Sequence, residues 1–345
     1  GGEWGTAVSS NVTIENNEFK YNNDAANPVT AIRLRGTGAI DGTTIHVHDN
    51  SFLDGGVHSG AYAVLHQGDQ TKSVDATCNW YATISTPLVY DAPSLSGPVT
   101  FMPLLTTGTD NDSGLFGFEP VPNSCSCPGG TVTNTTTLKT FCTIQAAIDD
   151  AQTLAGHTIT VSAGTYNEEI TVNKRLTIIG AGSGSNPSTN TVIQGSTLNV
   201  PVVKIRTGGL SVSDRATIKD VYVTTNASNT ISWIGGIEID ASNNNPLGHI
   251  TLENVTVANC LGKTTGVHFK GVSATGVSTD IISDVKIINS LITNNQYGIS
   301  ARHTQVHGLE ILGGSGRTVI SENRRAGMLI YGVDNGSGFS NQFDD

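Results

Sequence analysis

Short runs of alternating apolar and polar residues recur along the chain, and each ends at an asparagine or aspartate. They occupy residues 12–16 (VTIEN), 45–49 (IHVHD), 216–220 (ATIKD), 250–254 (ITLEN) and 285–289 (VKIIN). A period of two places the apolar residues on one face of a β-strand and the polar residues on the other. A terminal Asn or Asp suits a tight turn, because its side chain can bond its own backbone. The runs therefore predict strands that end at turns.

A second type of run follows each run of the first type. Between the two types, Phe19 and Phe52 each lie three residues after the Asn or Asp that ends the first run. The second runs are residues 31–34 (AIRL), 63–66 (AVLH), 236–239 (GIEI), 266–269 (GVHF), 298–301 (GISA) and 327–330 (GMLI). In the second half of the chain, the first type repeats at spacings of 34, 35 and 24 residues, the last of these leading to a looser run at 309–313 (LEILG). The second type repeats at 30, 32 and 29 residues. Repeats of this length are typical of a solenoid.

The stretch from Thr143 to Gly195 combines one amphipathic helix with short β-branched strands. The apolar residues of the helix fall on one face: Ile144, Ala147, Ile148, Ala151 and Leu154. We expect Thr143 to cap the start of this helix and Gly156 to cap its end.

The letters of this stretch carry a family resemblance. TIQAAI (143–148), TITVSAGTYNEEITV (158–172) and LTIIGAG (176–182) resemble the opening of the pectin-lyase-like right-handed parallel β-helices. ATCNWYAT (76–83) and GPVTFMPLL (97–105) resemble the closing segment of the same superfamily. The resemblance implies an all-β fold, a right-handed parallel β-helix solenoid with one short capping α-helix. It implies no particular activity, because the superfamily includes pectinesterases, polygalacturonases, polysaccharide lyases and catalytically silent surface proteins.

The closing segment precedes the opening segment, so the order looks permuted. We expect residues 1–105 to be the C-terminal half of a β-helix with its closing segment, and residues 106–141 to be a linker with cysteines. Residues 142–345 are expected to hold the N-terminal cap helix and the first half of a β-helix, continuing into residue 1 of a next unit. Three explanations stay open: one period of a tandem array, a subunit that stacks head to tail, or a fragment of two β-helices. The first two predict a fibre.

Composition narrows the partners. The net charge of −11 argues against a nucleic-acid partner, which needs a basic face. No apolar run reaches 18 residues, so no membrane-spanning segment is predicted. No cofactor is predicted.

Cysteines and glycosylation sequons favour an extracellular or cell-surface location. Cys125, Cys127 and Cys142 lie close together, and we expect a disulfide from Cys125 or Cys127 to Cys142, with three free thiols as the alternative. Six sequons are acceptors in principle: Asn11, Asn111, Asn134, Asn226, Asn254 and Asn335.

The catalytic motifs of the superfamily's enzymes are not found, so no catalytic residue is assigned. His46, His48 and Asp49 are a weak metal-site candidate, with ordinary polar surface as the alternative. The pair Arg324 and Arg325, and Arg302 with His307, are candidates for contact with an acidic sugar, with ordinary surface as the alternative. Trp4, Trp80 and Trp233 are each candidates for stacking on one sugar ring.

Asn16, Asn254 and Asn289 are expected to form an internal asparagine ladder, each side chain bonding the neighbouring coil. A role confined to the turn itself is the alternative.

These observations favour a non-catalytic structural protein, the repeat unit of an extracellular or cell-surface fibre whose partners are copies of itself. The alternative is a polysaccharide-active enzyme or a carbohydrate-binding module. The ligand and the covalent or non-covalent nature of the joints stay open.

Overall fold

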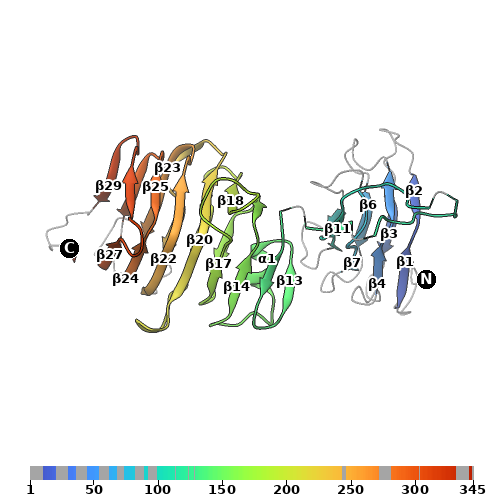
Figure 1. Cartoon of the computed structure of the whole chain (residues 1–345), viewed down its shortest axis with the longest axis horizontal. Helices are drawn as coiled ribbons and strands as arrows, with labels where there is room; N and C mark the ends of the chain where they lie inside the picture. The colour runs from blue at the N-terminus through green and yellow to red at the C-terminus, as the bar shows by residue number, and fades with distance from the viewer. Residues whose placement is uncertain are drawn as a thin grey trace. The chain divides into compact units, whose positions relative to one another are not determined.

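The computed structural model describes residues 11–20, 30–35, 45–53, 62–67, 74–81, 89–91, 99–112, 114–122, 124–127, 129–242, 246–271, 281–302, 304–331 and 342–343. The chain forms two compact units, Gly1–Pro128 and Gly129–Asp345, each taken by itself below (Figure 1). The all-β prediction is confirmed: the fold is a β-solenoid of about eight turns with one short helix.

The second unit is a solenoid in which successive coils add parallel strands to three sheets. The first sheet contains β14 (Thr158–Val161), β17 (Thr177–Ile179), β20 (Ala216–Thr225), β22 (Leu247–Ala258), β24 (Ile281–Ile288), β27 (Gln305–Leu312) and β30 (Gln342–Phe343). The far halves of β20 and β22 continue into the second sheet, with β15 (Gly164–Tyr166), β18 (Thr191–Gly195), β25 (Leu291–Thr293) and β28 (Val319–Ser321). The third contains β16 (Ile170–Val172), β19 (Val203–Ile205), β21 (Asn229–Asp240), β23 (Gly262–Lys270), β26 (Tyr297–Arg302) and β29 (Ala326–Tyr331).

Inward side chains of these strands form one hydrocarbon core. Ile218, Leu252 and Ile287 stand in register on β20, β22 and β24, and all are buried. The predicted turn residues Asp220, Asn254 and Asn289 all have positive φ, at 58°, 49° and 50°. Asn and Asp tolerate this left-handed conformation better than other side chains, which explains their place in the repeat.

The second unit starts with a small cap. Strands β12 (Val132–Asn134) and β13 (Lys139–Phe141) pair antiparallel, and β12 also pairs antiparallel with β14. Helix α1 (Ile144–Asp149) follows, and Thr143 caps it as predicted, accepting the Ala146 N–H at 3.1 Å.

The helix is shorter than predicted. It ends at Asp149, so Gly156, with φ 90°, does not cap it, and Leu154 is exposed rather than part of its apolar face. The Lys174 ammonium donates to the carbonyl oxygens of Ile148 and Asp150, at 2.6 and 3.0 Å, and so satisfies carbonyls at the helix end.

The first unit is also a parallel solenoid. Its sheets are β1 (Val12–Glu15), β4 (Ile45–His48), β7 (Val74–Asp75) and β9 (Val99–Thr100); β2 (Glu18–Lys20) and β5 (Ser51–Leu53); and β3 (Thr30–Arg35), β6 (Tyr62–Gln67) and β8 (Val89–Asp91). The rings of Phe19, Phe52 and Tyr81 stack in three successive coils, with centroids 4.9 and 5.2 Å apart.

The segment expected as a linker, residues 106–141, is divided between the two units. In the first, β10 (Leu104–Leu105) pairs antiparallel with β11 (Cys125–Ser126) and closes the last coil. In the second, β12 and β13 form the cap already described. No helix in the part of the chain that the structure describes is long and apolar enough to cross a membrane.

Candidate functional site: a buried charge cluster on the outer face of one sheet

The third sheet of the second unit carries polar side chains on its outer face. On β19, β21, β23 and β26 the inward residues are apolar, and the outward residues between them form two rows. Registered pairing aligns Lys204, Glu238, His268 and Ser300 in the first row. The second row aligns Asp240, Lys270 and Arg302, with Arg206 bonded to Asp240. We call these eight residues the charge cluster.

Glu238 lies at the centre of the cluster and is only 1% exposed. Its Oε1 is 3.3 Å from the Lys270 ammonium and 3.9 Å from that of Lys204. Its Oε2 is buried without a hydrogen-bond partner. Burial raises the pKa of Glu238, and the two lysines only partly oppose that effect. The carboxylate therefore keeps one acceptor atom unused.

Asp240, two residues along the same strand, is fully engaged. It accepts the Arg206 guanidinium at 3.0 and 3.2 Å and the Ser242 N–H at 3.0 Å. Burial raises its pKa, but these hydrogen bonds and the Lys270 charge outweigh burial, so the pKa is lowered overall. The two carboxylates of β21 thus differ: both oxygens of Asp240 accept hydrogen bonds, whereas Oε2 of Glu238 accepts none.

His268 is 2% exposed, and its Nδ1 lies 2.8 Å from Ser300 Oγ. Burial, together with the charges of Lys270 and Arg302, lowers the pKa of His268 to about 4. The imidazole is therefore neutral near pH 7 and acts as a hydrogen-bonding group rather than a cation.

An irregular segment of β21 brings an aromatic ring to the cluster. The pairing of β21 with β23 shifts register between Asn229 and Ile234, and Trp233 has φ 74°. The Trp233 ring stacks on Tyr297, with centroids 5.5 Å apart, and the Arg302 guanidinium lies 5.2 Å from its centroid. Arg302 Nε is buried and has no hydrogen-bond partner.

The cluster has four cations and two carboxylates, and the cations are the more accessible groups. The side chains of Lys270 and Arg206 are 40% and 38% exposed, against 1% and 0% for Glu238 and Asp240. An anionic group would therefore meet cations first. Among the described residues no group of three or more His, Cys, Asp or Glu side chains could hold a metal ion.

The weak metal candidate is not assembled. His46 Nδ1 is 3.4 Å from Asp75, while His48 Nδ1 is 2.9 Å from Asp49. The two histidines thus have different carboxylate partners, since each outward side chain turns to its nearest acid.

The asparagine ladder exists, but one residue later than predicted. Asn17, Asn50 and Asn79 form it: Asn50 Oδ1 accepts the Asn17 N–H, and Asn79 Oδ1 accepts the Asn50 N–H, both at 3.0 Å. Asn16 is exposed, with φ 58°. Its left-handed backbone turns the chain so that the next side chain, not its own, points inward.

The other two predicted members of the ladder bond neighbouring coils from the turn. Asn254 Nδ2 donates to Asp220 at 2.6 Å, and Asn289 Oδ1 accepts the Gly314 and Gly316 N–H groups at 2.7 and 2.9 Å. A second pair, Asn295 and Asn323, bonds in the same manner as the first-unit ladder.

Cys125 pairs with Cys78, a partner that the sequence analysis did not consider. Cys127 and Cys142 are also disulfide-bonded, and Cys260 is a buried free thiol. Sequence spacing drew attention to the three neighbouring cysteines, whereas the Cys78 partner depends on how the closing segment folds back onto the third coil.

The sequons differ in accessibility. Asn11, Asn111 and Asn226 are exposed. Asn134 is fully buried and donates to Thr153 at 2.8 Å, so it is not an acceptor in the folded chain. Asn254 is half-buried, and Asn335 lies outside the described residues.

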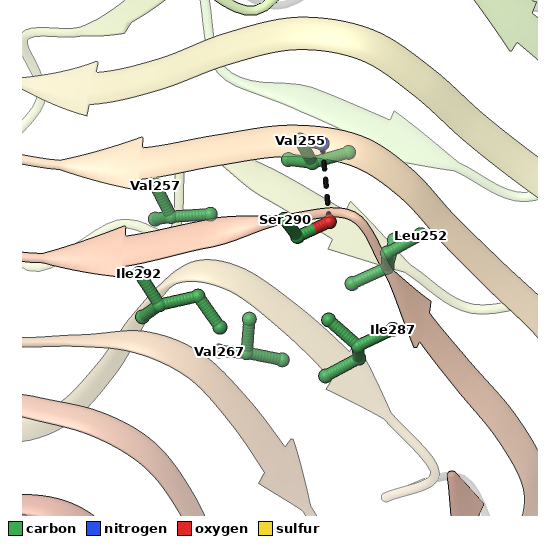
Figure 2. Close-up of a pocket in the computed structure, with 7 residues that line it drawn as sticks. All are labelled: Leu252, Val255, Val257, Val267, Ile287, Ser290 and Ile292. Atoms are coloured by element: carbon green, nitrogen blue, oxygen red, sulfur yellow. Dashed lines mark hydrogen bonds between the residues drawn. The ribbon is translucent and has the colours of Figure 1, made fainter. Parts of the chain in front are cut away.

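A depression in the interior of the second unit is too small to be a binding cavity. This depression is lined by Leu252, Val255, Val257, Val267, Ile287, Ser290 and Ile292 and has no space for a water molecule (Figure 2). Ser290 Oγ accepts the Val255 N–H at 3.1 Å there, which satisfies the polar atoms in the apolar lining.

Sequence reasoning missed the charge cluster, although a signal was present. The second type of run was identified from its apolar, inward residues. The outward residue in the third position of three of these runs is polar: Glu238, His268 and Ser300. Aligning the outward positions as well as the inward ones would have shown one continuous polar row.

One comparison gives a relative. A segment of 52 residues is 52% identical to a protein of Methanothermus fervidus named cell surface glycoprotein. The match covers 15% of this chain and 9% of that protein, so the chain spans only a small part of the relative. No protein-family profile matches the chain, and no solved structure matches it.

Proposed function

We propose that this chain is a structural protein of the cell surface, a β-solenoid unit that joins to further units end to end in a fibre. The observation that carries the proposal is the pairing of the outer strands. In the described residues β1, β2 and β3 each pair on one side only, as do β28 and β29. Open parallel edges present unpaired N–H and C=O groups that another strand can satisfy.

Two further observations support it. The matched relative carries the name of a cell surface glycoprotein, and four cysteines are disulfide-bonded, which is typical of proteins outside the reducing cytosol. The contact is heterologous, because a leading edge meets a trailing edge, and such a contact propagates when it does not close into a ring.

A proline at the leading edge tests the proposal. The Asn16 N–H and the Ile14 carbonyl both bond groups of the following coil. Successive residues of a strand point their backbone N–H and C=O groups to opposite sides. Because Ile14 faces the following coil, the N–H of Thr13 faces the open edge. Thr13→Pro removes that donor, and Thr13→Ala keeps it as the matched control.

We expect the wild type and Thr13→Ala to form filaments whose length grows with concentration, and Thr13→Pro to form fewer and shorter ones. Sedimentation velocity and negative-stain imaging measure both. A wild type that stays monomeric at every concentration contradicts the proposal. The mass of dissociated native material separates stacking, with units near 35.9 kDa, from a covalent tandem array of greater mass.

A second candidate, binding of an acidic polysaccharide, is favoured by the charge cluster. The accessible groups of the cluster are cations, Lys270 and Arg206, and the Arg302 guanidinium lies over the Trp233 ring beside them. A sugar carboxylate would pair with these cations, whereas the buried Glu238 and Asp240 would not meet it. Calorimetry with polyuronate chains tests this: Arg302→Gln should weaken binding at least tenfold, and Lys219→Gln on the first sheet should not. Equal heats for wild type and Arg302→Gln contradict it.

A further inference from the structure

The first unit carries a narrow hairpin that crosses its coils, which we call the hook (residues 108–112 and 114–120). The Asn111 N–H donates to the Glu119 carbonyl at 2.7 Å, and Asp110 bridges to Pro120. The hook has no regular strand of its own, so its position depends on what it lies against.

Two close backbone contacts fix that position. At one end, a side chain at Gly108 would collide with the Trp80 indole, in the third coil. At the other end, Gly117 has φ 123°, and a side chain there would come within 2.5 Å of the Asn16 carbonyl, in the first coil. The Phe118 N–H donates to that carbonyl at 3.0 Å, and Phe118 is fully buried. The hook therefore runs from the third coil to the first.

The tip of the hook is apolar and uncovered. Leu115 is 60% exposed and Phe116 is 107% exposed, the largest fraction among the exposed large apolar residues described. In Figure 1 the blue-green segment extends past β2 at the open edge of the first unit. An exposed aromatic ring at an unpaired edge indicates a contact with a further chain.

The hook is also acidic. It carries Asp110, Asp112 and Glu119 and neither Lys nor Arg, whereas the two carboxylates of the first coil, Glu15 and Glu18, are balanced by Lys20, Arg33 and Arg35. Burial, followed by the carboxylates of Asp110 and Asp112, raises the pKa of Glu119. A partner surface for the tip should therefore combine an apolar contact with positive charge.

The last coils of the second unit present such a surface. The turn after β27 is the counterpart of the turn at Asn16, because each leads from the first sheet to the second. Its residues 313–318 (GGSGRT) are mostly small, and Leu312 before them is 39% exposed. We call residues 312–318 the receiving loop. It carries exposed Arg317, and Arg324 and Arg325 are exposed on the same coil.

We propose that the hook of one copy docks on the receiving loop of a second copy, with Phe116 on Leu312 and the small residues, and Asp112 beside Arg317. This inference rests on the proposed end-to-end function and identifies the residues that meet at the joint between two copies. In a continued solenoid β30 of the second copy would lie next to β1, and the hook, which extends past the leading edge, would reach over that coil to the turn of β27. Charge complementarity and the apolar tip favour this occupant over other partners.

Charge reversal with mixing tests the contact. Asp112→Arg and Arg317→Asp each place like charges at every joint of a pure sample, so each alone should associate at least tenfold more weakly than wild type. In an equimolar mixture every joint between unlike copies pairs Arg with Asp. The mixture should therefore recover filaments that neither variant forms alone, which no misfolded variant would do.

An apolar substitution completes the test. Phe116→Ser should weaken association at least tenfold, while Leu210→Ser, at a 77% exposed site elsewhere, should not. Salt should weaken wild-type association. If the wild type assembles and all three hook and loop variants assemble equally well, the contact is wrong but the end-to-end function stands. A wild type that never assembles overturns both.

Discussion

The Glu168 carboxylate accepts the backbone N–H of Ile144 at 2.7 Å, and its second oxygen accepts that of Gln145 at 3.0 Å. These are the first two N–H groups of α1, which no residue inside the helix can bond. A side chain from the strand region thus caps the only helix described, and it holds the cap of the second unit against the first coil.

Replacing Glu168 should destabilise the second unit. We expect Glu168→Ala to lower the free energy of unfolding by about 1–2 kcal/mol, because two buried donors lose their acceptor. Denaturant unfolding followed by circular dichroism measures the change. Glu169→Ala is the neighbouring comparison: it removes the acceptor of the Ser196 and Thr197 N–H groups but leaves the α1 donors bonded. Because those two hydrogen bonds are exposed, its loss should be smaller, and an equal loss in both variants would contradict the capping role.

The asparagine ladder should be sensitive at its middle rung. Asn50 accepts the Asn17 N–H and donates to the carbonyls of Ile14 and His48, both at 2.8 Å. Asn50→Ala leaves these part-buried groups, and the buried Asn79 Oδ1 that accepts the Asn50 amide, without side-chain partners, and we expect a loss of about 2–4 kcal/mol. Asn17→Ala, at the exposed end of the ladder, should cost clearly less. Equal losses measured by denaturant unfolding would show that the ladder does not act as a buried network.

The disulfide of the first unit should stabilise its closing segment. Cys78 and Cys125 are 47 residues apart in sequence, and cross-linking a loop of that size contributes about 4 kcal/mol in the chain-entropy description. In the double variant Cys78→Ser, Cys125→Ser, we expect the amide hydrogens of the first unit to exchange faster than those of the second unit. Protection of the β22 and β24 amides in the second unit should stay unchanged, and loss of protection there would contradict a local effect.

Acid should destabilise the second unit through His268. Its folded pKa of about 4 lies below the ordinary value of 6.5, so the unfolded chain binds more protons between these values. The stabilisation is complete above pH 6.5 and is lost as pH falls towards 4, by about 3 kcal/mol at most. His268→Gln should flatten the pH dependence of unfolding in this window. An unchanged slope in this window would contradict a lowered pKa of His268 in the folded chain.

Glycans, where the source attaches them, should follow exposure. We expect modification at Asn226 and none at Asn134, whose amide is buried against Thr153; Asn11 and Asn111 are exposed in a single chain, but they lie beside β1 and in the hook, so the proposed end-to-end contact requires them to be unmodified. Peptide mapping of native material by mass spectrometry decides this. A glycan on Asn134 would contradict the folded arrangement of β12.

The sequence by itself determined the coil. Alternation with a period of two at Ile218, Leu252 and Ile287 required inward side chains, and the Asp and Asn residues that end each run mark left-handed turns. Thr143 was readable as a cap because an N-cap is a local motif. These features depend on neighbouring residues only, so periodicity and local chemistry are sufficient to predict them.

Only the tertiary structure decided which residues of different coils meet. A one-residue error in register exchanged Asn16 for Asn17, because a side chain's direction after a left-handed residue depends on the backbone. The pairing of Cys78 with Cys125, the capping of α1 by Glu168 and the row from Lys204 to Ser300 join residues tens of positions apart. Coil lengths vary with each loop, so sequence spacing alone does not give the stacking register, and the register determines those contacts.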